Sequence, residues 1–274
     1  MTESENLKKR PEADKHWLTW VLFLAVIAGI LIAGALIDEA DIAADFLQKN
    51  QPPSMKYPFG TDWLGRNMML RTIKGMYYSI RLGMVSTLVS AVFAVIIGVI
   101  AAMGSKRADG AVKWVIDLVM GIPHIVLLIL ISFACGRGET GLFAGIVLTH
   151  WTSLARLVRA EVLQIRSQNY IKISKSLGHS RAWILKEHIL PHIVPQFIVG
   201  MVVMFPHAVL HESALSFLGY GLPPEQPAIG IILSESMKYL SSGMWWLAIF
   251  PGIMLALVVL MFDRLGESLT DKGN

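Results

Sequence analysis

The sequence predicts an all-α membrane protein with six transmembrane helices. Its 274 residues are 54% hydrophobic and only 16% charged, whereas about 25% of the residues in a soluble domain are charged. The mean hydropathy is +0.55, and apolar runs long enough to cross a bilayer recur along the chain. Such a composition excludes a soluble globular domain, and the single cysteine excludes a disulfide-stapled secreted one.

Six charge-free runs mark the predicted spans. A helix rises about 1.5 Å per residue, so roughly 20 apolar residues cross the hydrocarbon layer. The fourth run is shorter, but its helix can continue because Arg156 and Arg159 can extend their charged ends toward the headgroups. The runs comprise residues 17–37, 82–105, 118–136, 140–155, 189–210 and 239–262.

The first run follows a basic N-terminal tail, residues 1–16. A cleaved signal peptide has an apolar core of roughly 7 to 15 residues. The run at 17–37 is longer than that, so we expect an uncleaved first transmembrane helix.

The distribution of basic residues predicts the orientation. Of the 24 Lys and Arg, 16 fall before residue 17, within 106–113 and 156–186, or in the C-terminal tail 263–274. Cytoplasmic loops carry the excess of basic residues in membrane proteins. We therefore expect both termini in the cytoplasm, with membrane lipid as a partner. The net charge of +4 reflects this bias, and no nucleic acid is expected as a partner.

The predicted outer loop, residues 38–78, contains a near match to a phosphate-binding loop. Residues 59–67 read FGTDWLGRN, close to G-x-x-x-x-G-K-[ST], but Arg66 replaces the lysine and Asn67 replaces the hydroxyl that would hold magnesium. The segment also lies on the side of the membrane opposite to ATP. We interpret it as a turn-rich outer element that leads into the second span.

The most informative loop is cytoplasmic. Residues 170–177 can form about two helical turns, Gly178 suits a left-handed C-terminal cap, and Ser180 can cap a second short helix over 182–186. This predicts a helix, a sharp bend and another helix, with side chains available for another protein's groove. The alternative is a basic segment attracted to the membrane surface.

Several stretches of the chain resemble one family of transport proteins. Residues 170–191 resemble the cytoplasmic EAA loop of ABC-importer permeases. Other stretches, in the same order and spacing, resemble the oligopeptide, dipeptide and nickel permeases of that family, and specifically the C type of the two paired permeases. They are FGTDxLGR at 59–66, ALSFLGxG at 214–221 with Pro223-Pro224, and Phe250-Pro251-Gly252 followed by Asp263.

The resemblance implies a type I ABC-importer permease fold with a transmembrane core at 79–262. Its coupling loop, residues 156–190, would dock on an ATPase subunit. The implied partners are a second homologous permease, two cytoplasmic ATPase subunits and an extracytoplasmic substrate-binding protein. No catalysis and no cofactor are expected on this chain, since ATP and Mg belong to the ATPase subunits. The coupling residues carried over are Tyr170, Lys172, Lys175, Leu177, Gly178, His179 and Ser180.

The loop departs from the family pattern at three positions. Lys172 stands where the glutamate is usual, and Ile173 and Ser174 stand for two alanines. One docking contact is thereby altered, while Gly178 keeps the bend.

Ionisable residues within the runs indicate a polar path. Such groups cost about 2.5 to 3.5 kcal/mol each in a bilayer, so they face cavities or partners. Asp117 has a simple partner in Lys113, four residues earlier. The candidates for the translocation path are His150, His207, His211 and Glu212, and His124 is a further ionisable residue in the third run.

His207 and His211 are the metal candidates, because a spacing of four places them on one helix face. Imidazole suits nickel, copper and zinc, and Glu212 could support it. The alternative is that Pro206 loosens the helix and the histidines satisfy freed carbonyls or contact the other permease. His150 and the His-x-x-x-His pair also resemble the nickel-transporting branch of the family. The predicted cargo is nickel, free or chelated, or short peptides.

Two other functional classes remain as alternatives. An intramembrane zinc protease needs H-E-x-x-H, which does not occur in the chain, and only Ser213 or Ser216 near His211 would suit a serine protease. A self-contained secondary transporter predicts inverted repeats and a broken helix at the midplane, for which Pro206 and Pro251 are candidates. Six spans with a large basic inner loop favour the ATPase-coupled permease.

Overall fold

The computed structural model describes residues 10–273, with side chains described for residues 20–270. Within this part of the chain the regular elements are helices, and the only pairing between extended segments is an isolated bridge from Thr61 to Asn67. The elements are α1 (Arg10–Leu36), η1 (Glu39–Ile42), η2 (Phe46–Gln48), α2 (Met68–Met103), α3 (Lys106–Gly121), α4 (His124–Ala134), α5 (Gly138–Ser167), α6 (Asn169–Ser176), α7 (Arg181–Ile184), the π-helical turn η3 (Leu185–Ile189), α8 (Leu190–Phe217), α9 (Ile229–Met237), η4 (Leu240–Ser242) and α10 (Trp246–Gly273).

Four helical segments are long and apolar enough to cross a membrane: α2, α5, the run Arg181–Phe217 and α10. Two more spans result if each bent pair of helices counts as one. The first pair joins Trp20–Leu36 to Glu39–Gln48 with a bend of 95°, and the second joins α3 to α4 with a bend of 100°. The predicted fold class, an all-α membrane protein with six spans, is confirmed on this count.

The second span begins earlier than predicted. Asn67 caps α2 by accepting hydrogen bonds from the backbone of Met69 and Leu70, so residues 68–78 of the expected outer loop belong to this helix. Arg81 bounded the charge-free run in the sequence, yet Arg71, Lys74 and Arg81 all lie within α2 and have partners on other parts of the chain. Lys74, for example, donates hydrogen bonds to the carbonyls of Gly34 and Ile37 at the end of α1.

The third predicted span, residues 118–136, is wrong as a continuous helix. The chain turns by 100° between α3 and α4, at Ile122 and Pro123. Proline lacks the N–H of a helical turn and disfavours the α conformation in the residue before it, and Ile122 is accordingly extended, with φ −92° and ψ 136°. His124 is the first residue of the new helix.

The ends of the chain are more helical than the predicted tails. Helix α1 starts at Arg10, within the expected tail, and residues 1–9 lie outside the described part. Helix α10 starts at Trp246, seven residues after the predicted start, and continues to Gly273 through the expected C-terminal tail.

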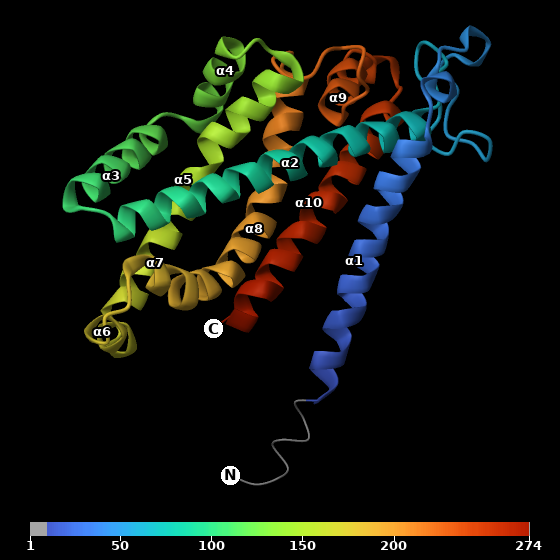
Figure 1. Cartoon of the computed structure of the whole chain (residues 1–274). Helices are drawn as coiled ribbons and strands as arrows, with labels where there is room; N and C mark the ends of the chain where they lie inside the picture. Colours follow the sequence, from blue (N-terminus) through green and yellow to red (C-terminus); the bar gives the residue numbers. More distant parts are fainter. Residues whose placement is uncertain (1–9, 274) are drawn as a thin grey trace.

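Helix α2 is the centre of the bundle and buries small residues along its length. Alanine, glycine, serine and threonine predominate among them, and they allow the backbones of neighbouring helices to approach closely. A Cβ on Gly83 would lie 2.7 Å from Val209 on α8, and one on Gly98 would lie 2.8 Å from the carbonyl of Ala155 on α5. Figure 1 shows α2 crossing α5, α8 and α10.

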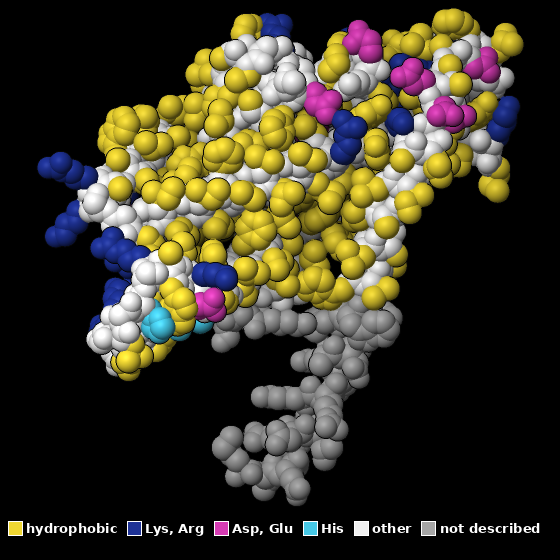
Figure 2. Space-filling view, in the orientation of Figure 1, with side chains coloured by type: hydrophobic (Ala, Val, Ile, Leu, Met, Phe, Trp, Pro, Cys, Tyr) yellow, Lys and Arg dark blue, Asp and Glu magenta, His cyan; other side chains and the backbone are white. Residues whose placement is uncertain are grey.

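The two ends of the bundle differ in what they carry. Helices α6 and α7 and the C-terminus lie at one end, whereas α4, α9 and the segment between α1 and α2 lie at the other (Figure 1). Hydrophobic side chains form a broad band between them, and charged side chains gather toward the ends of the molecule (Figure 2). This is the pattern of a bundle that contacts lipid around its middle.

Candidate functional site: a histidine-lined cavity and a projecting bent segment

A cavity of about 670 Å³ lies where the break between α3 and α4 meets α5 and α8. Its volume is within the range of small-molecule sites, about 300 to 1,000 Å³. Among the described residues that line it, the only ionisable side chains are histidines. The lining consists of Val119, Met120, Gly121, Ile122, Pro123, His124, Thr149, His150, Thr152, Ser153, Val203, Met204, His207 and His211.

Three of these histidines form a compact group. His124 begins α4, His150 lies in α5 and His211 lies in α8. Their possible ligand nitrogens all lie within 4.8 Å of one another, and the ring centroids are 4.6 to 5.3 Å apart. The bend at Pro123 is what brings His124 to the other two, because a straight third span would carry this residue along one continuous helix axis.

The hydrogen bonds of His150 define how its ring is held. Its Nδ1 lies 3.0 Å from the carbonyl oxygen of Ile146, which can only accept. Nδ1 therefore carries the proton in that contact, and Nε2 is left with a free lone pair. This Nε2 is buried without a hydrogen-bond partner in the structure, as is Nε2 of His124. Two inward-facing imidazole nitrogens thus lack a partner at one site.

The structure separates the residues predicted for the translocation path. His207 lines the cavity together with His211, as their spacing on one helix face predicted, but it lies outside the group of three. Glu212 is not among the cavity-lining residues: its carboxylate is fully buried and accepts hydrogen bonds from Ser213 and Ser216. Glu212 therefore belongs to the packing of α8 and not to the cavity wall.

Sequence reasoning missed His124 as a member of the histidine group and misassigned the partner of Asp117. The signal for His124 was Pro123, which starts a new helix at the histidine. Asp117 pairs with Arg156 on α5 at 2.9 Å, and not with Lys113 as expected. The pairing is long-range in sequence, so the rule for neighbours within one helix could not detect it.

The helix predicted over 170–177, the bend at Gly178 and the second short helix predicted over 182–186 are present as α6, the turn after it, and α7 with η3. We call residues 169–189 the coupling segment. Helix α6 ends at Ser176 and Leu177 is its C-cap, after which Gly178 has φ +86°. The N–H of Gly178 donates to the carbonyl of Lys175, and that of His179 donates to Ser174, which is a Schellman motif. Ser180 then caps α7 by accepting from the N–H of Trp183. The local prediction for this segment is confirmed.

Side-chain contacts tie the two arms of the coupling segment together. The ring of His179 stacks on Trp183 with centroids 3.7 Å apart, and His188 contacts Trp183 edge-on. Ser174 on α6 also lies within hydrogen-bond distance of Nε2 of His188, at 3.0 Å. These contacts make the bend a defined unit and not a loose loop.

The same segment leaves apolar side chains uncovered. Helix α6 buries Ile171 and Ser174 against its own chain, but Ile173 is 60% exposed and Leu177 is 73% exposed. Tyr170, Lys172, Lys175 and Ser180 are exposed as well, and the helices α6 and α7 of this segment lie at one end of the bundle (Figure 1). Exposed apolar side chains on a rigid support are typical of a protein–protein contact.

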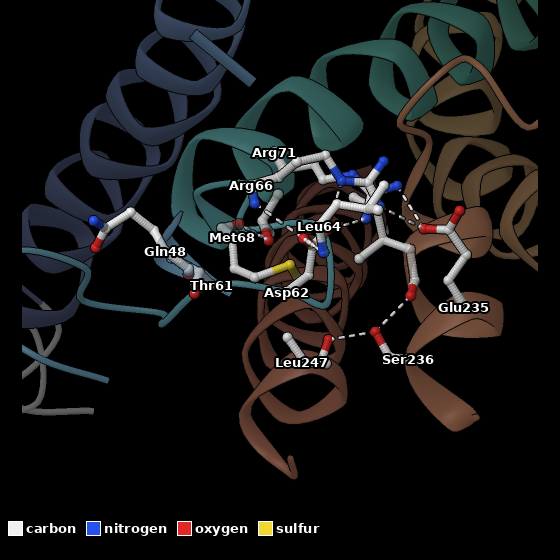
Figure 3. A network of polar contacts seen from close by, with 12 residues as sticks. Gln48, Thr61, Asp62, Leu64, Arg66, Met68, Arg71, Glu235, Ser236 and Leu247 are labelled. Carbon is white, nitrogen blue, oxygen red and sulfur yellow. Dashed lines mark hydrogen bonds and ion pairs between the residues drawn. The ribbon is translucent and has the colours of Figure 1, made fainter. Parts of the chain in front are cut away.

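At the opposite end a buried ion network joins α9 to residues 37–67 between α1 and α2, which we call the outer segment after its expected side of the membrane. Asp62 is fully buried and lies 2.6 Å from Nε of Arg66 and 3.3 Å from Arg71. Arg71 also lies 2.5 Å from Glu235 on α9 (Figure 3). The guanidinium group of Arg66 is therefore already paired with carboxylates. This pairing agrees with a structural turn and not with a phosphate-binding loop.

These features define a class of protein: a multi-pass membrane transport subunit with an internal cavity and a projecting contact segment. The sequence profile of the family described as "Binding-protein-dependent transport system inner membrane component" matches residues 94–272. The chain belongs to this family of ABC-importer permeases. The resemblance seen in the sequence is confirmed.

The relatives include named transport proteins. The dipeptide transport system permease protein DppC of Bacillus subtilis is 32% identical over 251 residues, covering 92% of this chain and 78% of that protein. The oligopeptide transport system permease protein OppC of the same organism is 28% identical over 263 residues, covering 96% and 86%.

Solved structures share the fold. One described as "Inward facing conformations of the MetNI methionine ABC transporter" superposes with a TM-score of 0.57 at 19% identity, covering 74% of this chain and 97% of that one. An amino acid ABC transporter crystallised with histidines gives a TM-score of 0.58 at 15% identity, covering 74% and 94%. At these identities the likeness concerns the fold alone.

Proposed function

We propose that this chain is one permease subunit of an ATP-driven importer that carries nickel, free or chelated, or short peptides across the cytoplasmic membrane. A second homologous permease would complete the path, two cytoplasmic ATPase subunits would drive it, and an extracytoplasmic binding protein would deliver the cargo. Both termini would be cytoplasmic, as the distribution of Lys and Arg favours. The names of the peptide-transporting relatives support the peptide cargo.

The observation that carries the proposal is the coupling segment, residues 169–189. Its apolar side chains Ile173 and Leu177 are exposed, whereas the bend beneath them is fixed by hydrogen bonds and ring stacking. An ATPase groove that closes over these side chains would move the segment as a unit. A loose loop cannot transmit such a displacement, whereas a bend that is fixed by helix caps and ring stacking can.

The coupling segment is continuous with the helices that line the cavity. Helix α5 leads into it and α8 leads out of it. From His150 to the end of α5 is 17 residues, or about 26 Å at the rise of an α-helix. A displacement at the segment would therefore reach the cavity wall through two helices at once, which is the requirement of alternating access.

The energetic demand on this coupling can be stated. To change the ratio of two states from 1:99 to 99:1, ATP must bind one state more tightly by about 5.5 kcal/mol. That differential binding reaches the permease only through the segment that contacts the ATPase. A substitution that softens the bend should therefore uncouple hydrolysis from transport without dissociating the subunits.

Gly178→Val tests the proposal, because a β-branched residue is strained at φ +86° although nothing lies within 4 Å of its Cβ position. We expect loss of uptake and of substrate-stimulated ATP hydrolysis in the reconstituted complex, with co-purification of the subunits retained. Gly136→Val is the matched control: Gly136 has φ +99°, equally open surroundings and the same Schellman hydrogen bonds, but it follows α4 at the far end. Normal coupling in Gly178→Val would contradict the docking role.

A peptide importer without a metal role is the second candidate. It is favoured by the names of the relatives, and it differs from the first only in cargo. Uptake by the complete complex should be measured with radioactive nickel and with a panel of di- and oligopeptides. Nickel uptake that requires His207 and His211, with peptide uptake unaffected in the double alanine variant, would select the metal cargo. Nickel uptake unchanged in that variant would remove the metal role of this pair.

A further inference from the structure

We propose that His124, His150 and His211 together form a transient binding site for a divalent transition-metal ion on the transport path. The inference rests on the proposed importer function and deepens it, since it identifies a ligand set and a chemical class of cargo. It replaces the pair His207 and His211 by a set drawn from three helices.

The donor atoms define the class of ion. The three side chains offer only imidazole nitrogens, all within 4.8 Å of one another. Imidazole suits nickel, copper and zinc, whereas magnesium and calcium prefer oxygen ligands. The described lining of the cavity contains no carboxylate that would bind the harder ions.

His150 is already held as a ligand would be. Its Nδ1 is bonded to the carbonyl of Ile146 at 3.0 Å, the outer hydrogen bond that metal-bound histidines typically make. This bond leaves Nε2 as the metal-binding atom, and the side chain is only 9% exposed. Nε2 of His150 and Nε2 of His124 are both buried without a partner. Unsatisfied buried polar atoms are uncommon, and a bound cation would satisfy both.

The distances between the nitrogens can be compared with those around a bound ion. A tetrahedral ion with bonds of about 2.0 to 2.1 Å places its ligand nitrogens roughly 3.3 Å apart. The possible ligand nitrogens of the three side chains lie within 4.8 Å of one another, so small movements of the rings or of their helices would give this spacing. Binding would therefore be tightest in the arrangement that brings the three helices closest together.

The placement of the ligands couples this closure to transport. His150 is on α5 and His211 is on α8, the two helices joined by the coupling segment, whereas His124 is on α4. A movement of α5 and α8 relative to α4 changes the distances between the three ligands. Affinity would then differ between the two states of the transporter, as capture on one side and release on the other require.

The site leaves room for other ligands of the ion. Three protein nitrogens fill three positions of a four- to six-coordinate ion, and the remaining positions can take water or the oxygens of a chelator. The cavity of about 670 Å³ has space for a small chelate.

The test is a titration of the assembled transporter, without its binding protein and purified through a tag that contains no histidine. Co²⁺ is the probe, because its visible absorption reports nitrogen coordination at low coordination number. We expect saturable binding with one ion per copy of this chain. His124→Ala and His211→Ala, both at partly exposed positions, should each weaken binding at least about 10-fold.

His192→Ala is the matched control, because this exposed histidine also lies on α8 but neither lines the cavity nor belongs to the group of three. It should leave the affinity for Co²⁺ unchanged. The inference is overturned if the transporter binds no Co²⁺, if the ion still binds with His124, His150 and His211 all replaced by alanine, or if His192→Ala weakens binding as much as His124→Ala does.

A separate readout distinguishes this inference from the importer function. Substrate-stimulated ATP hydrolysis with a transported peptide should be measured on the same variants. If hydrolysis is stimulated and no variant affects Co²⁺ binding, the metal site is wrong while the importer function stands. If Co²⁺ binds as expected but Gly178→Val couples normally, the metal site stands and the proposed coupling is wrong.

Discussion

Replacing Asp62 by asparagine isolates the charge of the ion network at the outer end. Oδ1 of Asp62 accepts from the backbone of Leu64 at 2.9 Å and of Arg66 at 3.0 Å. Oδ2 instead faces Nε of Arg66 at 2.6 Å and Nη1 of Arg71 at 3.3 Å. An asparagine oxygen in the position of Oδ1 keeps both turn hydrogen bonds. Its NH₂ group then meets two guanidinium groups that can only donate.

The cost of this change follows from burial. The side chain of Asp62 is 0% exposed and that of Arg71 is 3% exposed, so water cannot replace the lost contacts. Each hydrogen bond to a charged partner contributes about 1.5 to 3 kcal/mol, and breaking a buried pair costs about 3 to 5 kcal/mol. Glu235 still compensates part of the charge on Arg71, at 2.5 Å. We therefore expect a loss of about 3 kcal/mol in the free energy of unfolding.

Thermal unfolding of the detergent-solubilised chain, followed by tryptophan fluorescence, measures the effect. In a protein of this size class a change of 1 kcal/mol shifts Tm by about 2 to 4 °C, so Asp62→Asn should lower Tm by roughly 6 to 12 °C. Asp45→Asn is the control in the same outer segment. The exposed carboxylate of Asp45 caps η2 by accepting from Leu47 at 3.1 Å, and asparagine caps a helix equally well.

The two variants remove the same charge from the same segment, so their difference reports burial and pairing. Equal Tm values for Asp62→Asn and Asp45→Asn would refute the argument that the network holds the outer segment to α9. A loss of Tm in both variants would instead assign the effect to the charge of the segment as a whole.

Two further predictions address packing and orientation. Gly98→Val should lower the free energy of unfolding by about 1 to 3 kcal/mol, because its Cβ would lie 2.8 Å from a carbonyl of α5, whereas Gly29→Val meets nothing within 4 Å and should not. Thermal unfolding of both variants tests this, and equal stability would show that α2 and α5 separate without cost. Cys135 is the only cysteine and is exposed at the end opposite to the coupling segment. A membrane-impermeant maleimide should therefore label it in intact cells, whereas Leu177→Cys in a Cys135→Ser background should react only after permeabilisation; the reverse pattern would invert the proposed topology.

The coupling segment was predictable because single residues determine its form. A positive φ is readily adopted only by glycine, and Gly178 follows two turns of helix-forming sequence. Ser180 can accept a hydrogen bond from the next helix wherever it precedes one. Both effects act within a few residues, so no knowledge of the rest of the fold is required. The structure reproduces both, with φ +86° at Gly178 and the cap from Ser180 to Trp183.

The helix boundaries were less predictable, because a hydropathy profile scores a charged residue as polar whether or not another residue in the fold neutralises its charge. Arg71 fell in the predicted outer loop, before the second span, yet it lies in the first turns of α2 and is balanced by Asp62 and Glu235. The break after α3 was hidden for the opposite reason. Ile122 and Pro123 are apolar, so the mean hydropathy of a window that contains them stays high. Pro123 nevertheless cannot continue the helix.

The ligand set of the cavity could not be derived from spacing within one helix. The spacing of four residues along a helix selected His207 and His211, which share a face of α8. Ligands on one rigid helix keep their separation in every state, so such a pair has the same geometry whichever way the path opens. A ligand shifts a conformational equilibrium only by its differential affinity for the two states. His124, His150 and His211 lie on three helices, and only such a set can change its geometry when those helices move. The requirement for coupling therefore favours the set that the fold assembles over the pair that periodicity selects.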